Sequence, residues 1–385
     1  MSEVMRTERD GISVFSTNEP GSLTVGLVLR AGECDESVEL RGVGSLAQEL
    51  VLSGLARNDG FLKASVGLEC SAIQMTGDPR RVVDGFAQLN ASIVQPRYEQ
   101  IPHLSAQLRN LHKPDDLRTA LGRSLAARVG TSGLGASGCP PRFLAAPDAL
   151  QLHQWMTTHF GTANSVIWSS APLPPEFSFR LPVGGSISVP EPSWVPGAYP
   201  GVLLAGESLC LTILDYWSPE LVVAAHAARA SFEAALFKQL GVPIQVELGL
   251  DLVNRNSLCH ATFMFKSGPR VLGEVRDCAI TEWRKMCWDG IAPEVLGAVA
   301  EGLLSMAPSM GLLGPSAAEA ATSWLLRTTP INGEAIGQAA RSMSPALASE
   351  YLEAAGAGSL WLAAPDLGWR DFRFHTVGVP EAALV

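Results

Sequence analysis

The chain has little charge and no long apolar run. Charged residues make up 17% of its 385 residues. No window reaches the roughly 18 consecutive apolar residues that a membrane helix needs, and residues 1–15 hold no apolar stretch of signal-peptide length. We therefore expect a cytoplasmic globular protein without a membrane partner. Its length and its 47% of hydrophobic residues are enough for two domains with cores of their own.

Clusters of basic residues are also missing. The formal net charge is −10 at pH 7, and Lys and Arg form no run. Nucleic-acid binding needs such clusters to displace counterions from phosphates, so we expect no nucleic-acid partner. An acidic surface favours either a basic peptide partner or solubility alone.

Signatures of common enzyme sites are absent as well. The seven cysteines include no C-x-x-C pair, and the seven histidines form no H-x-x-x-H or H-x-x-E-H pair. We expect the cysteines to be small buried residues. No G-x-S-x-G elbow or P-loop exists. GLGASG at residues 133–138 fits G-x-G-x-x-G, but a helical pattern precedes it where the dinucleotide fingerprint needs a strand, so we predict a plain glycine loop.

What the chain does contain is one order of elements, written twice. A strand pattern at residues 21–32 precedes a helix at 42–56, a strand, turn and helix at 69–95, and a closing strand at 163–172. The patterns at 207–216, 224–241, 259–291 and 357–366 repeat this order about 190 residues later. Hairpin strands with intervening helices are typical of an α+β fold, with an antiparallel sheet and helices on one face in each copy.

A proline-rich segment separates the two copies. Residues 171–200 contain eight prolines, which disfavour both helix and central strand. We predict an N-terminal domain at 1–170, an interdomain linker at 171–200 and a C-terminal domain at 201–385.

A polar stripe marks the first predicted helix, GVGSLAQELVLSGL at residues 42–55. Ser45, Gln48 and Glu49 lie at i, i+3 and i+4, so they point the same way from an otherwise apolar helix. Two ligands and a general base at this spacing would make a zinc peptidase, but these residue types do not suit that chemistry. A solvated helix face would show the same stripe.

Residues 21–55, 77–100, 104–121 and 150–170 together resemble the inverted-motif zinc peptidases, the pitrilysin and mitochondrial-processing-peptidase-like superfamily. In that family a strand ends in an Ala-Gly-acidic turn and leads to a helix carrying H-x-x-E-H. The overlay places Ser45 at the first histidine, Gln48 at the glutamate that activates water and Glu49 at the second histidine. Gln107 takes the place of the third zinc ligand. The resemblance implies two homologous α/β domains that form one half of a clamshell.

These four residues predict a degenerate site. A catalytic zinc needs three good protein ligands and an open position for water, and the family also needs a carboxylate to accept the proton of that water. Serine and amide side chains are poor zinc ligands, and Gln48 cannot act as a base. We therefore expect no catalytic residue, metal or other cofactor in this chain. A new metal site formed by Glu49 and a distant histidine is the remaining alternative.

The second half departs from the family too. Family members often carry a Gly-Gly-Gly-x-Ser-Ser-Arg-Leu stretch, followed by an arginine and a tyrosine that hold the substrate backbone. Residues 224–248 have alanines in place of the glycines, and Ile244 stands where the tyrosine would. Arg229 and Lys238 are the nearby cations, so they either contact a peptide substrate or are ordinary surface residues.

The resemblance also implies a role for an inactive half. Half-length members form dimers that close around a peptide chamber. We expect this chain to be the non-catalytic subunit of a heterodimeric zinc endopeptidase, with the zinc in an active H-x-x-E-H partner. Leader removal from a ribosomally made precursor peptide in a bacterium is the expected reaction. The peptide would add as a strand to a sheet edge. By resemblance the equivalent edge in this chain is the strand around residues 62–73, but in a heterodimer we expect the productive edge to belong to the partner.

Two other functions remain open at this point. One is a structural core subunit, like the degenerate relatives that scaffold a respiratory cytochrome complex. The other is a peptide-binding protein that works alone. A neighbouring gene for an intact H-x-x-E-H half favours the peptidase pair, and neighbouring cytochrome genes favour the scaffold.

Overall fold

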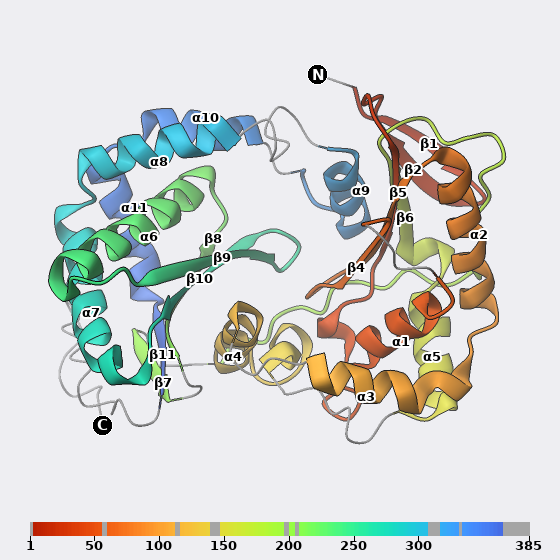
Figure 1. Ribbon diagram of the computed structural model, residues 1–385, viewed down its shortest axis with the longest axis horizontal. Helices are drawn as coiled ribbons and strands as arrows, with labels where there is room; N and C mark the ends of the chain where they lie inside the picture. The colour runs from red at the N-terminus through yellow and green to blue at the C-terminus, as the bar shows by residue number, and fades with distance from the viewer. Residues whose placement is uncertain are drawn as a thin grey trace. The chain divides into compact units, whose positions relative to one another are not determined.

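The computed structural model describes residues 3–55, 60–111, 116–138, 147–195, 200–204, 208–306, 316–330 and 333–364 (Figure 1). The chain divides into two compact units. Unit 1 comprises Met1–His112, Thr131–Pro192 and Gly314–Ile331, and unit 2 comprises Lys113–Gly130, Ser193–Leu313 and Asn332–Val385. Each half of the sequence thus gives one segment to the unit built mainly from the other half, in place of the continuous division at residues 171–200.

Unit 1 is built on a six-stranded sheet. Its strand order is β1-β2-β6-β3-β5-β4, and all neighbours are antiparallel except β2 and β6. The strands are β1 Met5–Arg9, β2 Ile12–Ser16, β3 Leu23–Leu29, β4 Leu62–Val66, β5 Ser71–Gly77 and β6 Ser165–Ser169. The helices are α1 Val43–Leu52, α2 Pro79–Val94, α3 Ile101–Leu111, α5 Ala149–His159 and α9 Ala317–Leu326.

Unit 2 is built on a five-stranded sheet. Its order is β7-β11-β8-β10-β9, with β7 and β11 parallel and the other neighbours antiparallel. The strands are β7 Gly201–Leu204, β8 Leu209–Tyr216, β9 Gln245–Val253, β10 Leu258–Lys266 and β11 Leu360–Ala363. The helices are α4 Leu117–Val129, α6 Pro219–Leu240, α7 Leu272–Asp289, α8 Pro293–Met306, α10 Gly333–Ser342 and α11 Pro345–Ala357.

The repeat expected from the sequence is present in the two sheets. Without β1, the order β2-β6-β3-β5-β4 matches β7-β11-β8-β10-β9 strand for strand. The helices repeat in the same order along the chain: α1, α2 and α3 correspond to α6, α7 and α8, and α4 corresponds to α9. The α+β fold class is therefore confirmed, with one parallel strand pair in each sheet that the hairpin pattern did not indicate.

Each sheet is covered on both faces, because a helix from the other half of the sequence lies on its second face. In unit 1, Leu27 and Leu29 face the main helical layer, whereas Val28 packs with α9. Figure 1 shows α9, coloured blue as a late part of the chain, beside the early strands of unit 1. In unit 2, α4 lies on the corresponding face, where Ala120 packs with Met264. The pattern of helices on one face was therefore incomplete.

The proline-rich segment belongs largely to unit 1. Its described part, residues 171–195, forms neither helix nor strand. Phe177 and Phe179 are buried there, with ring centroids 5.2 and 5.5 Å from that of Phe86 on α2. Arg9 donates a 3.0 Å hydrogen bond to the carbonyl of Phe177. This stretch is thus part of the core of unit 1. Its prolines exclude helix and central strand, but they do not keep its aromatic side chains from packing against α2.

In the part of the chain that the structure describes, none of the helices combines the length and the apolar character needed to cross a membrane.

Candidate functional site

The helix α1 begins at a buried charge cluster. The carboxylate of Glu36 accepts hydrogen bonds from the backbone N–H groups of Gly42, at 2.8 Å, and Gly44, at 2.9 Å, and it also pairs with Arg41. The first amides of a helix have no hydrogen-bond partner within the helix, so this carboxylate accepts from them. Its negative charge also interacts favourably with the positive end of the helix dipole. Burial raises the pKa of Glu36, and Arg41 and the two amides oppose that rise. The start of α1 is thereby fixed.

Gln48 is buried and ties α1 to the edge of the sheet. Its Nε2 donates to the carbonyls of Ser65 and Ala72, both at 3.1 Å. Ser65 on β4 and Ala72 on β5 lie opposite each other in the hairpin. A primary amide has two N–H groups, and both are used here. This residue therefore acts as a double donor toward backbone, a role that a carboxylate could not fill.

The other stripe residues lie in different surroundings. Ser45 and Glu49 are half-buried on α1, one helical turn apart. Gln107 is exposed on α3, where its amide nitrogen lies 2.9 Å from Nε2 of His103 on the same helix. The hydrogen bonds thus direct Gln48 to the β4–β5 hairpin and Gln107 to its own helix.

The donor chemistry of these residues does not fit zinc. They supply one hydroxyl, two amides and one carboxylate, whereas zinc sites use thiolate, imidazole and carboxylate ligands. Within the described ranges, no three His, Cys, Asp or Glu side chains form a group that could hold a metal ion. The alternative of Glu49 with a distant histidine gains no support from the described residues.

A serine–histidine pair in unit 2 has the geometry of a hydrogen-bonded dyad but not its accessibility. Nε2 of His260 lies 2.8 Å from Oγ of Ser124, and both side chains are fully buried. Burial, together with the positive charge of Arg128, lowers the pKa of His260 to about 3. Oγ of Ser124 also accepts from Nε of Arg128 at 3.1 Å. This cluster joins α4 to the sheet, and no substrate can reach it.

The glycine-rich segment and the cysteines lie in surroundings that do not indicate a cofactor site or a reactive thiol. Residues Gly133–Gly138 form a short 3-10 helix, not the plain loop expected, and α4 rather than a strand comes before it. All cysteines of the described part are free; four are buried, and Cys70 and Cys287 are half-buried. Burial raises the pKa of these two thiols to about 12, so they are protonated and unreactive at neutral pH. Cys139 lies outside the described residues.

The two cations proposed for substrate contact lie on α6 but not together. Arg229 lines a pocket, whereas Lys238 is exposed in the last turn. They are nine positions apart, which places them on roughly opposite sides of the helix. Ile244, at the position of the family's tyrosine, is buried in the core of unit 2. Arg229 and Lys238 therefore do not form one site on α6, and Ile244 offers no polar group to a substrate.

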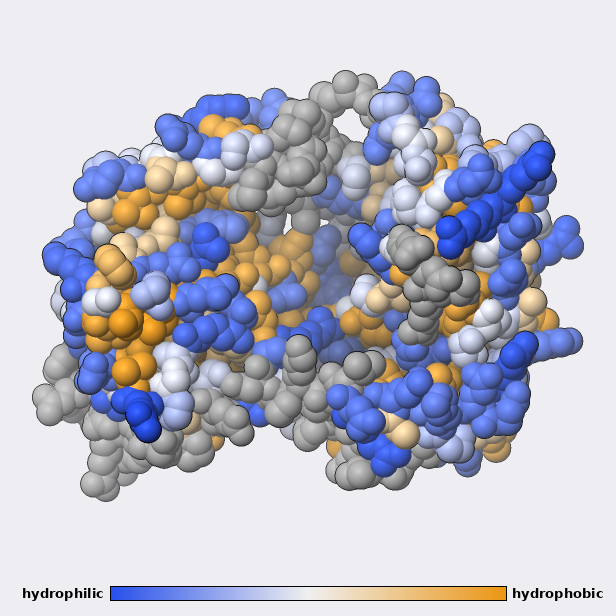
Figure 2. All heavy atoms as spheres, in the orientation of Figure 1, coloured by the Kyte–Doolittle hydropathy of each residue, from blue (hydrophilic) through white to orange (hydrophobic). Residues whose placement is uncertain are grey.

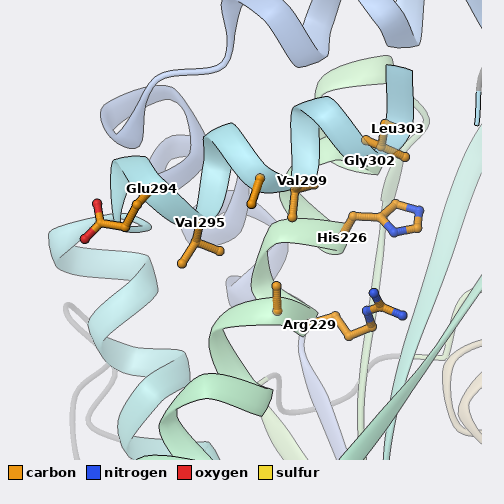
Figure 3. Close-up of a pocket in the computed structure, with 9 residues that line it drawn as sticks. His226, Arg229, Glu294, Val295, Val299, Gly302 and Leu303 are labelled. Atoms are coloured by element: carbon orange, nitrogen blue, oxygen red, sulfur yellow. The ribbon is translucent and has the colours of Figure 1, made fainter. Parts of the chain in front are cut away.

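The pocket lies between α6 and α8 and measures about 380 Å³. In Figure 3, His226 and Arg229 extend from α6 at the Leu303 end of α8, and Glu294 lies at the other end of the groove. The wall between them is apolar and consists of Ala230, Val295, Ala298, Val299, Gly302 and Leu303. In Figure 2, apolar residues are exposed in the part of the view where α6 and α8 lie.

Two features of this pocket set its electrostatics. Nε of Arg229 is buried and has no hydrogen-bond partner among the described residues. Burial, followed by the positive charge of Arg229, lowers the pKa of His226, so the imidazole is neutral at pH 7. The basic end of the pocket therefore carries the single charge of Arg229.

The sequence pattern did not identify His226 or the pocket. His226 and Arg229 are spaced i, i+3 on a helix, which is the signal that they share a face. The α8 wall comes about 70 residues later in the chain, so the pocket depends on packing that no local pattern reports.

No protein-family model matches the chain, and no curated protein sequence matches it. Solved structures do resemble it. A protease from Helicobacter pylori has a TM-score of 0.72 at 11% identity over 94% of this chain and 100% of that one. A chain of Complex III2 from Candida albicans, with Inz-5 bound, has a TM-score of 0.71 at 12% identity over 96% and 99%.

A peptidase M16 inactive domain from Pseudomonas fluorescens is also similar, with a TM-score of 0.68 at 12% identity over 94% of this chain and 98% of that one. The ferredoxin protease FusC has a TM-score of 0.61, and this chain spans 48% of its length. At these identities the likeness concerns the fold. The chain has the two-unit, pitrilysin-like fold that the sequence resemblance implied.

Proposed function

We propose that this chain is a non-catalytic, peptidase-like subunit that pairs with an active H-x-x-E-H zinc endopeptidase and helps to bind its peptide substrate. Leader removal from a ribosomally made precursor peptide is the proposed reaction. The zinc and the general base belong to the partner, and this chain contributes a wall of the peptide chamber.

The observation that carries the proposal is the environment of Gln48. The family's general base would stand at this position, and a base must accept a proton. The amide of Gln48 instead donates both of its N–H groups to backbone carbonyls of β4 and β5. The helix and the hairpin are retained, and the residue between them has a structural use. The likeness to a peptidase M16 inactive domain supports the same interpretation.

The experiment is co-expression with the H-x-x-E-H protein encoded nearest to this chain. Zinc content and cleavage of a candidate precursor would be measured for each chain alone and for the pair. We expect the pair to cleave the precursor and each chain by itself to be inactive, with about one zinc bound per heterodimer. Replacing the motif glutamate of the partner should abolish cleavage, and Glu49→Ala in this chain should leave it unchanged. Zinc binding and cleavage by this chain alone would contradict the proposal.

A scaffold subunit of a larger complex is the second candidate. It is favoured by the similarity of nearly the whole chain to a chain of Complex III2. This function would be supported over the peptidase pair if the chain co-purifies with its partners as a stable complex and that complex cleaves no precursor, whether or not zinc is added.

A further inference from the structure

We propose that the groove between α6 and α8 binds the C-terminal residues of an apolar peptide through their free carboxylate. Arg229 would hold the carboxylate, and the apolar wall of α8 would hold the side chains. This inference concerns the chain by itself and holds whether or not it pairs with a zinc peptidase.

The charge at the Leu303 end of the groove carries the first step. Arg229 is half-buried and lines this end of the pocket, and its guanidinium carries a permanent positive charge there. A carboxylate is the acceptor that a guanidinium binds best, through two parallel hydrogen bonds. His226 stands beside it as a neutral imidazole that can donate a third bond.

The wall and the far end carry the second step. The six lining residues between the two ends are alanine, glycine, valine or leucine, so they offer no hydrogen bonds from side chains. The volume of about 380 Å³ lies within the range of pockets that hold small ligands, and it accommodates an apolar di- or tripeptide. Glu294 at the other end disfavours a second negative charge there. A ligand with a single carboxylate and an apolar body fits this arrangement.

The position in the repeat adds a third observation. The helices α6 and α8 correspond to α1 and α3, which carry Gln48 and Gln107 in unit 1. In unit 1 the stripe is occupied by its own hydrogen bonds, as Gln48 binds the hairpin. In unit 2 the corresponding helices, α6 and α8, line the pocket.

Calorimetric titration of the full chain tests the proposal. The probes are N-acetyl-leucyl-leucine as the free acid, its C-terminal amide, and octanoate. We expect the acid to bind at least about tenfold more tightly than the amide, because the amide has no charge for Arg229. Equal binding of acid and amide, or no binding of any probe at millimolar concentration, would overturn it. Tighter binding of octanoate than of the peptide acid would overturn the peptide assignment.

Two matched pairs of variants locate the site. Arg229→Gln should weaken binding of the acid by about tenfold, and Lys238→Gln, on the same helix but exposed, should change it by less than about twofold. Gly302→Leu should fill the groove, because Gly302 lines the pocket and the added Cβ meets no atom within 4 Å. Gly297→Leu adds the same side chain to α8, again without a clash, at a position that does not line the pocket. Thermal melting checks that all four variants fold. Unchanged binding in Gly302→Leu would place the ligand elsewhere.

Discussion

Units 1 and 2 are built from the same series of strands and helices, but the helix on the second face of each sheet is held by different forces. In unit 1, α9 packs through Ala317, Ala321 and the ring of Trp324. In unit 2, α4 adds a buried network that includes Ser124, Arg128 and His260. The same position in a repeat can thus be stabilised by apolar contact or by buried hydrogen bonds. The second solution depends on charge state and pH.

The hydrogen bonds that join the first helix of each unit to the neighbouring hairpin also differ, because donor and acceptor are reversed between the two units. In unit 1, Gln48 of α1 donates to carbonyls of β4 and β5. In unit 2, Oε1 of Glu233 on α6 accepts from the backbone N–H of Val246 on β9, at 3.1 Å. A donor side chain meets acceptors in one unit, and an acceptor meets a donor in the other.

Replacing Arg128 should have the largest effect. It donates to the carbonyl of Gly358 at 2.7 Å, to Oγ of Ser124 at 3.1 Å and to the carbonyl of Thr212 at 3.3 Å. Arg128→Met leaves these buried acceptors without that donor, so we expect the free energy of unfolding to fall by about 4 kcal/mol. Hydrogen exchange should accelerate in β8 and β11 but not in β2 and β6. The control is Arg80→Met, at an exposed position of α2.

Reversing the polarity of the Gln48 link should have the next largest effect. Gln48→Glu places a carboxylate against two carbonyls, and we expect a loss of about 3 kcal/mol at pH 7. The loss should shrink at low pH, because a protonated carboxyl donates to one carbonyl again. Urea unfolding at pH 7 and pH 5 measures both. Gln107→Glu, the same change at an exposed position, should alter stability little; equal losses in the two variants would refute the role of Gln48.

Lowering the pH should weaken the α4 contact selectively. The pKa of His260 is about 3 in the folded chain and about 6.5 when unfolded, so its contribution is present above pH 6.5 and is lost as the pH falls toward 3. Between pH 7 and pH 5 this amounts to about 2 kcal/mol. Exchange in β8 and β10 should report it, and His260→Asn should flatten the dependence. An equally steep dependence in His260→Asn would assign it to another group.

The smallest effect should come from the apolar helix. The Trp324 ring lies over the guanidinium of Arg6, at 4.7 Å, and 6.1 Å from the ring of Phe15. Trp324→Ala should lower the free energy of unfolding by about 1 kcal/mol. The loss should be equal at pH 7 and pH 5, because neither Arg6 nor Phe15 titrates in that range. Exchange in β2 and β6 measures the effect, with Trp288→Ala, an exposed tryptophan of α7, as control. A pH-dependent loss would remove the distinction between the two helices.

Local patterns account for what could be predicted. The structure contains a helix at Val43–Leu52 within the predicted 42–56, the turn that Asp78 and Pro79 make before α2, and the predicted order of strands along the chain. Each of these features depends on neighbours in sequence. The residue types of the stripe likewise exclude an ordinary zinc site without any coordinates. The exposed position of Gln107 could not be predicted, because burial depends on which helix packs beside it.

The sequence by itself determined that the chain is a duplicated α+β protein and that its motif helix lacks the ligands for zinc, since periodicity and side-chain chemistry are properties of single segments. Tertiary structure alone decided the exchange of α4 and α9, the partners of Gln48 and Arg128, and the groove at Arg229. The hydrogen bond from Gln48 to Ser65 joins residues 17 positions apart, and the one from Arg128 to Gly358 joins residues 230 positions apart, so chain packing, not local preference, selects them.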